Sequence, residues 1–268
     1  MQTDSRPIAF FDSGVGGLPY LEAARRLLPL ERYVYLADRS GFPYGTKSAE
    51  TVIALATKAI AALVAHEDPK ALVVACNTAT ELAIDDIRRA NPGLQVIGTV
   101  PAIKPAAAVS RVRRIGVVAT AAAAAATYLG DLARASAPDC VLVKRGDPDL
   151  VNFVEHRFID ATKAERLAAV MPAVEAMKRE GVDVIVLGCT HFLHVADAFV
   201  EAAGPGIAIL DSRQGVVARL RSLVKPTAVP ASERKPDAMY LTGPGDFGPV
   251  YGGFADRFGL AQAGTFTP

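Results

Sequence analysis

Residues 70–80 read KALVVACNTAT, and residues 182–191 read VDVIVLGCTH. Each stretch starts with a short apolar run, which is typical of a buried strand, and reaches a cysteine that is followed by polar residues. A helix is expected to begin near Thr80, soon after the first run ends. The second stretch therefore repeats the first, and Cys76 and Cys189 each lie at the tip of a predicted strand.

Further predicted strands and helices alternate around these two stretches. PIAFFD at 7–12 opens the first half as RRIGVVAT at 113–120 opens the second, and each opening strand ends in an oxygen-bearing residue, Asp12 or Thr120. The other expected elements are strands at 33–37 and 94–100, helices from residue 18 and from about 48 to 65, and a final strand and helix within 239–260.

Such alternation is typical of an α/β fold with mainly parallel sheets. We therefore expect two similar, pseudo-symmetric lobes in which helices flank each sheet. The first lobe is predicted to span residues 1–98 and 209–268, and the second lobe residues 99–208. Ligands of such folds bind at the carboxyl ends of the strands, so a ligand between two such lobes would meet one thiol from each side.

The composition is that of an ordinary globular protein. Of 268 residues, 51% are hydrophobic and 21% are charged, and the formal net charge is +1. The apolar content excludes disorder for most of the chain, and the balanced charge argues against nucleic acid or a membrane surface as a partner. With three cysteines, no secretory signal and no apolar stretch of about 18 residues, we expect a soluble, cytoplasmic protein without a disulfide framework.

Cys76 and Cys189 are candidates for acid/base chemistry because each lies where a strand gives way to a helical segment. The positive end of a helix dipole lowers the pKa of a thiol and raises the thiolate fraction. The alternative is that each cysteine is a small buried hydrophobe, which is common for free cysteine. Their equivalent placement before polar residues favours chemistry, whereas Cys140 in APDCVLV is expected to be structural.

Asp12 and Ser13 close the first strand directly before a glycine-rich loop, GVGG at 14–17. The plain interpretation is an Asp that caps a helix in a tight turn. A strand, a glycine-rich turn, a helix and the later Asp38 also resemble a dinucleotide site. However, Pro19 stands where that fingerprint requires a small residue, so we exclude the dinucleotide interpretation.

Three further polar positions have plain interpretations of their own. His191 forms a Cys-x-His pair with Cys189, which alone is weak evidence for zinc, and we interpret this histidine as a polar partner of the thiol. Glu155, in LVNFVEHR, by itself predicts a solvated helix carboxylate. Tyr44 and Gly45, in FPYGTKS, by themselves predict only a turn.

Four motifs occur in order along the chain: FDSGVGGL (11–18), FPYGTKS (42–48), ACNTAT (75–80) and LGCTHF (187–192). Together they resemble the glutamate racemase family, which belongs to the aspartate/glutamate racemase superfamily and needs no cofactor. The resemblance runs from residue 8 to about residue 260. The four motifs are specific jointly, whereas any one of them alone would not be.

This resemblance implies two α/β lobes that face each other across a cleft that holds glutamate. It implies that Cys76 and Cys189 act as the acid and the base, that Asp12 and His191 assist the thiols, and that Glu155 is a further acidic group of the site. It implies no metal and no other cofactor. The residues that it implies in substrate binding are Asp12, Ser13, Tyr44, Gly45, Asn77, Thr78, Thr120, Thr190 and His191.

The resemblance also implies a biological role, which is supplying D-glutamate for peptidoglycan and hence for cell wall biogenesis and cell shape. The expected partner is the small-molecule substrate, with no nucleic acid and no membrane, and a homodimer is compatible with the resemblance. The segment before Asp12 lacks the long extension of members that a cell-wall precursor activates, so we do not expect that activation here.

Two places depart from the family pattern. The family usually has a second Thr three residues after the position of Thr120, but here Ala123 lies within six consecutive alanines, Ala121–Ala126. We therefore expect the second lobe to hold the substrate carboxylate more weakly. Leu193 and His194 also replace the more usual Pro and apolar residue after the Thr-His-aromatic motif.

Racemisation itself requires two acid/base groups, because one residue cannot reach both faces of a fixed Cα. A thiolate on one face and a thiol on the other meet this need, and no electron sink such as pyridoxal phosphate is evident in the sequence. Two alternatives stay open: a racemase or decarboxylase of aspartate or a related small acid, and a protein that binds an acidic amino acid without turning it over. The FPYGTKS segment favours glutamate.

Overall fold

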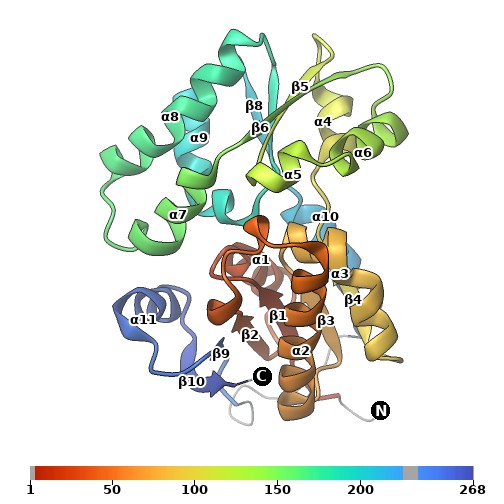
Figure 1. Cartoon of the computed structure of the whole chain (residues 1–268), viewed down its shortest axis with the longest axis vertical. Coiled ribbons are helices and arrows are strands. Elements are labelled where there is room, and N and C mark those ends of the chain that lie inside the picture. Colours follow the sequence, from red (N-terminus) through yellow and green to blue (C-terminus); the bar gives the residue numbers. More distant parts are fainter. Residues whose placement is uncertain (1–3, 226–234, 268) are drawn as a thin grey trace. The chain divides into compact units, whose positions relative to one another are not determined.

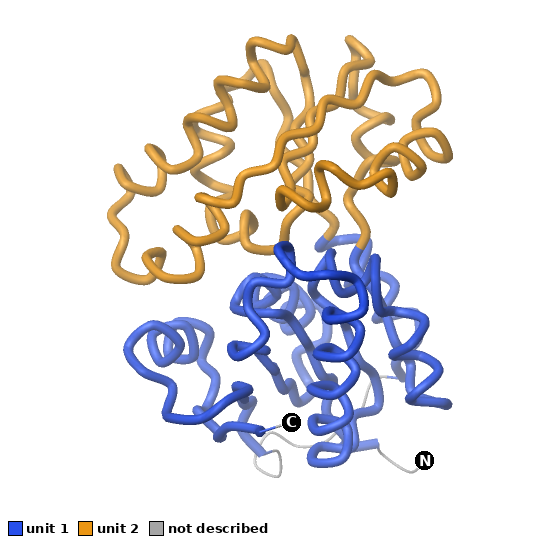
Figure 2. Tube along the Cα trace, in the orientation of Figure 1, with its two compact units in different colours: residues 1–99, 213–268 blue, residues 100–212 orange. Residues whose placement is uncertain are grey.

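The computed structural model describes residues 4–225 and 235–267, and this part of the chain divides into two compact units. Unit 1 takes in residues 1–99 and 213–268, and unit 2 takes in residues 100–212 (Figure 2). Unit 2 is therefore inserted into unit 1 along the chain. Each unit is built on its own sheet of parallel strands.

Within the described residues, unit 1 has a six-stranded parallel sheet in the order β10-β9-β2-β1-β3-β4 (Figure 1). All residues of β1 are buried, as in parallel sheets that are covered on both faces, which explains the uninterrupted apolar run PIAFFD. The strands are β1 (Ile8–Asp12), β2 (Tyr33–Ala37), β3 (Ala71–Val74), β4 (Gln95–Gly98), β9 (Ala238–Thr242) and β10 (Ala261–Phe266).

Unit 2, which is described throughout, has a four-stranded parallel sheet in the order β6-β5-β7-β8. This order matches β2-β1-β3-β4 of unit 1, so β5 corresponds to β1 and β7 corresponds to β3. The predicted α/β class with two parallel sheets is confirmed. The strands are β5 (Arg114–Ala119), β6 (Val141–Gly146), β7 (Val184–Leu187) and β8 (Ala208–Leu210).

Some of the helices begin where a side chain satisfies their first backbone N–H groups. Ser48 accepts from Thr51 N at the start of α2, and Thr162 and Glu165 form a capping box at the start of α8. Unit 1 contains α1 (Leu18–Leu27), η1 (Arg39–Gly41), η2 (Tyr44–Thr46), α2 (Ala49–Glu67), α3 (Asn77–Ala90), α10 (Arg213–Leu223) and α11 (Gly248–Arg257). Unit 2 contains α4 (Ile103–Val109), α5 (Ala121–Ala125), α6 (Tyr128–Ser136), α7 (Pro148–Arg157), α8 (Lys163–Arg179), η3 (Thr190–Val195) and α9 (Ala196–Ala203).

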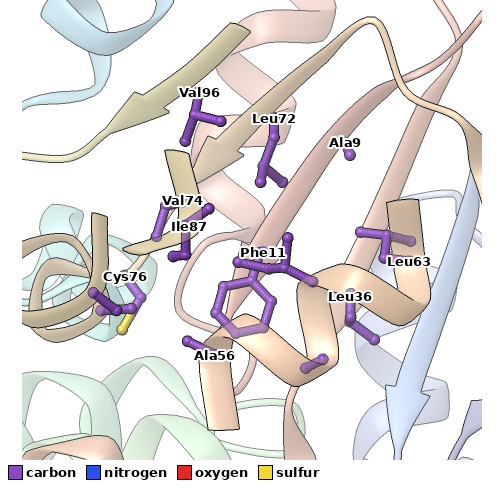
Figure 3. Packing of buried hydrophobic residues seen from close by; sticks show 14 of the residues in the cluster. Ala9, Phe11, Leu36, Ala56, Leu63, Leu72, Val74, Cys76, Ile87 and Val96 are labelled. Atoms are coloured by element: carbon purple, nitrogen blue, oxygen red, sulfur yellow. The ribbon is translucent and has the colours of Figure 1, made fainter. Parts of the chain in front are cut away.

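One hydrophobic cluster of unit 1 lies between the sheet and the helices α2 and α3. Phe11, Leu36 and Val74 of neighbouring strands pack there with Ala56 of α2 and Ile87 of α3 (Figure 3). The sheet residues of this cluster alternate along each strand, so they belong to one of the two faces of the sheet. Cys76 belongs to the same cluster, so the proposed reactive thiol lies at the end of a packed core.

Helix α2 is more apolar than the sequence analysis allowed. It has 19 residues and a mean hydropathy of 1.4, so that length and composition alone would suffice for a membrane span. The expectation that no stretch reaches this length was wrong for this segment. Its buried residues belong to the core of unit 1, and they are Val52, Ala56, Ala59, Ile60 and Leu63. We therefore assign α2 to the helical layer of that unit.

Helix α3 begins earlier than the predicted start near Thr80. Asn77 is its first residue and Cys76 is its N-cap, with an extended backbone at φ −136° and ψ 118°. The Cys76 carbonyl already accepts the Thr80 N–H at 2.9 Å, so the first turn of the helix closes directly after the thiol. The helical N-terminus thus starts at the cysteine itself.

Candidate active site

In unit 1 the candidate residues lie at the carboxyl edge of the sheet. Strands β1, β2, β3 and β9 run parallel, so their carboxyl ends lie along one edge. Asp12 and Thr242 end their strands, Asp38 directly follows β2, and Cys76 lies two residues after β3. Ligands of open α/β sheets bind at this edge. The sequence analysis expected Asp12 and Cys76 here, but it did not assign Asp38 or Thr242 to the site.

Asp12 organises the turn that follows β1. Its carboxylate oxygen Oδ1 accepts the Gly14 N–H at 2.9 Å and the Ser13 hydroxyl at 3.2 Å, and its side chain is fully buried. The N-cap of α1 is Gly17, so Asp12 stabilises the turn and does not cap the helix. The plain interpretation as a helix cap was wrong in this respect.

The glycine-rich loop packs closely against the neighbouring strands. A Cβ atom on Gly17 would lie 2.7 Å from Ala75 Cβ and 3.0 Å from the Tyr35 hydroxyl oxygen. Gly17 N donates to the Tyr35 hydroxyl at 3.1 Å, and that hydroxyl donates to Gly14 O at 2.8 Å. Close packing beside the Cys76 segment therefore accounts for a glycine at this position.

Cys76 is a buried thiol whose pKa is raised. Its Sγ lies 3.8 Å from Ser13 Oγ, at hydrogen-bond distance for sulfur. Burial, and next the negative charge of Asp12, raise the pKa of Cys76 to about 12, although the Ala79 and Ser13 N–H groups act in the opposite direction. The expectation that the helix N-terminus lowers this pKa was therefore wrong, because loss of hydration outweighs the helix dipole. At neutral pH, Cys76 is a protonated thiol.

Tyr44 is tied to a network that the sequence analysis missed. Its hydroxyl donates to Asp38 Oδ2 at 2.6 Å, and burial and this carboxylate raise its pKa, so that it stays protonated. The Thr242 hydroxyl donates to Asp38 Oδ1, and Ser40 Oγ lies 2.8 Å from Thr242 Oγ1. Asp38 thus holds the Tyr44 loop to the end of β9. The sequence feature that could have identified Asp38 as a site residue is its position directly after a buried strand, at the edge where ligands bind.

The remaining unit 1 candidates lie in the same loops and helix start. Asn77 and Thr78 are the first residues of α3, directly after the thiol, and Thr78 is buried. Gly45 lies in η2 beside Tyr44 and is half-buried. The structure thus brings these predicted residues of unit 1 to one edge of one sheet.

In unit 2, Cys189 occupies the position that corresponds to Cys76. It is buried and is the N-cap of η3, two residues beyond the end of β7. Gly188 lets the strand end approach β5 closely, since a Cβ there would lie 2.8 Å from Val117 Cγ1. Thr190, the first residue of η3, is also buried. The second thiol therefore has the same relation to strand and helix as the first.

His191 links Cys189 to Glu155. Its Nδ1 lies 3.9 Å from Cys189 Sγ, and its Nε2 lies 2.8 Å from Glu155 Oε2. Burial disfavours a charged imidazole, but hydrogen bonds and negative charge from Cys189 and Glu155 raise the pKa of His191 well above its usual value. Glu155 is fully buried in α7, so its interpretation as a solvated carboxylate was wrong.

Thr120 lies at the end of β5 and caps the short helix α5. Its Oγ1 accepts the Ala123 N–H at 3.2 Å, and no acceptor for its own hydroxyl hydrogen is found among the described residues. Ala123 is half-buried and packs against the core of unit 2. The alanine run therefore forms a helix that carries methyl groups at the ligand edge of this sheet.

Cys140 has a different local environment from Cys76 and Cys189. It precedes β6 and is half-buried, and its Sγ lies 3.9 Å from Asp139 Oδ1. Across residues 4–225 and 235–267, no group of three or more His, Cys, Asp and Glu side chains is arranged to hold a metal ion. Among the described thiols, Cys76 and Cys189 are the buried ones.

The comparisons with known proteins agree with one another. The family model "Asp/Glu/Hydantoin racemase" matches residues 20–220. Glutamate racemases of Treponema pallidum (strain Nichols) and Sphingopyxis alaskensis are 38% and 39% identical to the chain, covering 96% and 84% of it and 95% and 84% of their own lengths. Escherichia coli glutamate racemase, in complex with L-glutamate and the activator UDP-MurNAc-Ala, matches with a TM-score of 0.85 at 28% identity over 98% of both chains. The chain therefore belongs to the Asp/Glu/Hydantoin racemase family, among the glutamate racemases, and is an isomerase.

Proposed function

We propose that this protein interconverts L- and D-glutamate with two cysteines as acid and base and without a cofactor. The observation that carries the proposal is the equivalent placement of two buried thiols, Cys76 after β3 and Cys189 after β7, in sheets of matching strand order. The relatives that share most of the chain's length are glutamate racemases.

The proton transfers balance in each direction. From L-glutamate, the Cys189 thiolate takes the Cα proton, and the Cys76 thiol delivers its own proton to the opposite face. Cys189 is then a thiol and Cys76 a thiolate, which is the form that reacts with D-glutamate. Exchange of one proton with solvent restores the first form, so that no proton is gained or lost over a full cycle.

The surroundings of the two thiols suit these different states. Burial, and next the carboxylate of Asp12, favour the protonated form of Cys76, which is the proton donor for L-glutamate. On the other side, a protonated His191 offers a hydrogen-bond donor to Cys189 Sγ while that sulfur carries negative charge. Glu155 then stabilises the imidazolium from its far nitrogen.

The remaining polar groups are proposed to hold glutamate. Ser13, Gly45, Asn77, Thr78 and Thr190 lie directly beside the thiols in sequence or on the same sheet edge. Backbone N–H groups at the starts of α3 and η3 are suited to stabilise the charge that develops on the substrate carboxylate.

Tyr44 and Thr120 differ in what they can offer to the substrate. Tyr44 donates its hydroxyl hydrogen to Asp38, so toward glutamate it can only accept, and the ammonium group is the matching donor. Thr120 accepts from Ala123 N and keeps its own hydrogen for a carboxylate oxygen.

The biological role that we propose is supplying D-glutamate to peptidoglycan synthesis in the cytoplasm. The protein would act on free glutamate with no metal, nucleic acid or membrane partner, and a homodimer fits this role. A racemase of aspartate or a related small acid is the nearest alternative. A glutamate binder without turnover is the other alternative, which the alanine run at α5 keeps open.

One measurement tests the proposed function directly. Purified protein is incubated with L-glutamate, or separately with D-glutamate, without added cofactor, and ellipticity is followed until it is constant. We expect both signals to decay to zero, because the two enantiomers have equal free energy. The same traces with L- and D-aspartate identify the preferred substrate, and stable signals with all four amino acids would contradict racemisation.

A further inference from the structure

Helices α7 and η3 of unit 2 face each other through two pairs of side chains. In a 3₁₀-helix, residues three apart lie directly above one another, so His191 and His194 project from one face of η3. Residues three apart also share a face of an α-helix. Glu155 and Phe158 are related in this way, since Phe158 is the C-cap of α7 and keeps helical backbone angles.

The first pair is the contact between Glu155 and His191, and the second pair is an aromatic contact. The His194 ring lies 5.2 Å from the Phe158 ring, with an interplanar angle of 58°. Phe158 is 1% exposed and His194 is 9% exposed, so this contact is largely shielded from water. The guanidinium of Arg166, from α8, lies 4.3 Å from the centre of the Phe158 ring and donates to Phe158 O at 3.3 Å. Phe158 is therefore a fixed support for the His194 ring.

We propose that His194 is a positioning residue, whose ring packs on Phe158 and fixes the rotation of η3 against α7, so that His191 stays between Glu155 and Cys189. This inference rests on the proposed racemisation. Because His191 is one turn of the same 3₁₀-helix away, any rotation of η3 moves its imidazole relative to Cys189 Sγ. His194 stands where the resembling family usually has an apolar residue, so this support is a feature of this chain.

Two substitutions at one position separate the ring contact from simple loss of structure. His194→Ala removes the ring, and we expect kcat/KM for glutamate to fall by about 10- to 100-fold, since misplacement of a catalytic group by about 1 Å has an effect of this size. His194→Phe keeps an aromatic ring against Phe158, and we expect it to retain most of the activity. Because L- and D-glutamate have equal free energy, kcat/KM must fall equally in both directions.

Deuterium at Cα shows which half of the reaction is impaired. If proton transfer to and from Cys189 becomes slower, breaking the Cα–²H bond of L-glutamate becomes more rate-limiting, and the isotope effect on L-glutamate rises. For D-glutamate, Cys76 breaks that bond before the slow step at Cys189, so the isotope effect on D-glutamate falls. A smaller folded fraction would lower both rates and leave both isotope effects unchanged.

A second variant and a control complete the experiment. Phe158→Leu removes the ring from the other side of the contact and is expected to give the same opposite changes in the two isotope effects. His66→Ala is the matched control, because the His66 ring packs on Tyr240 in unit 1, 5.4 Å away, and no site residue is involved. Its isotope effects should equal those of the wild type.

Three results would overturn the positioning role of His194. They are unchanged kcat/KM in His194→Ala, unchanged isotope effects in an impaired His194→Ala, and a His194→Phe variant as impaired as His194→Ala. A wild-type protein that leaves glutamate enantiomers unchanged would instead refute the proposed function, so the two failures are distinguishable.

Discussion

At the residue scale, the two buried thiols differ from Cys140 in what they contact. Cys76→Ala and Cys189→Ala should each abolish racemisation, because each variant lacks the group that serves one face of Cα. Cys140→Ala should be nearly silent, since that side chain is half-buried and contacts Asp139. Circular dichroism traces with both glutamate enantiomers measure the three variants. Full activity in either site variant would refute the two-base scheme.

The buried thiol of Cys76 also makes stability depend on pH. Its pKa is raised from 9.0 to about 12 by burial and by Asp12. Between these values the unfolded chain has released the proton and the folded chain has not, so the free energy of unfolding falls as pH rises. The slope is about 1.4 kcal/mol per pH unit for one such group.

Urea unfolding of the wild type and Cys76→Ala between about pH 8 and pH 10.5 measures this contribution. The stability difference between the two proteins should decrease by this slope above pH 9, because the variant lacks the thiol while other groups titrate equally. Parallel pH profiles would show that the folded and unfolded thiols titrate alike.

Ala123, in α5, is the position where the family usually has a threonine. In Ala123→Thr, a hydroxyl could donate to the substrate carboxylate, and a hydrogen bond to a charged group contributes about 1.5–3 kcal/mol. We expect KM for glutamate to fall, or kcat/KM to rise, by about tenfold. Ala122→Thr places the same hydroxyl on an exposed neighbour in α5 and serves as the control. Equal kinetics in both variants would show that a hydroxyl at position 123 does not contact the substrate carboxylate.

Local sequence was enough to single out the cysteines, but not their partners. Each cysteine directly follows an apolar run in the sequence. The prediction that Cys76 and Cys189 lie at strand ends therefore needed only their neighbours along the chain. Glu155 contacts His191, which lies 36 residues downstream, and Asp38 accepts a hydrogen bond from Thr242, 204 residues away. These distant contacts, and not the neighbouring sequence, show that the two carboxylates belong to the candidate site. A carboxylate that is buried by a distant partner looks like an ordinary surface residue in sequence.

At the scale of elements, the glycine-rich loop and the end of β3 are packed too closely for a side chain. Gly17→Ala would bring a Cβ within 2.7 Å of Ala75 Cβ, so the loop must move, and we expect a loss of about 1–3 kcal/mol of stability. Gly215→Ala, in the exposed first turns of α10, meets no atom within 4 Å and should stabilise by about 0.5–1 kcal/mol. Thermal unfolding of both variants checks the opposite signs, and equal shifts would contradict the packing argument.

The central strands were predictable from sequence because both of their faces are buried. β1, β2, β3 and β7 are uninterrupted apolar runs, and every residue in them is buried. β10 was not predicted, because it is an edge strand whose residues AQAGTF are mostly exposed and show no apolar run. Pairing with β9, which sequence does not reveal, makes it a strand.

At the scale of the whole molecule, we expect the reaction to need neither a metal nor an organic cofactor. Exhaustive dialysis against a chelator should leave the rate of glutamate racemisation unchanged, since both proton transfers are assigned to side chains of the chain itself. The measurement is the initial rate before and after dialysis, with re-addition of Zn²⁺ or Mg²⁺ as the control. A rate that is lost on chelation and recovered with metal would contradict the scheme.

The repeated strand order could be anticipated from sequence as two similar lobes, because each half contains an opening strand and a later strand with a cysteine. The matching orders β2-β1-β3-β4 and β6-β5-β7-β8 agree with that expectation. Strands β9 and β10 have no counterpart in unit 2, so the repeat is incomplete. The pairing of β9 with β2 joins chain segments about 200 residues apart, and β10 pairs in turn with β9.

The insertion of unit 2 into unit 1 affects how the protein is made on the ribosome. β2 pairs with β9, but β9 is synthesised only after the whole of unit 2. At roughly 5–20 residues per second, the free edge of β2 waits on the order of 10–40 s for its partner. During that time the nascent chain presents an apolar, unpaired strand edge of the kind that recruits other chains. Unit 2, in contrast, is continuous along the chain and can fold as soon as it emerges. It can therefore be complete before unit 1, which needs residues 213–268.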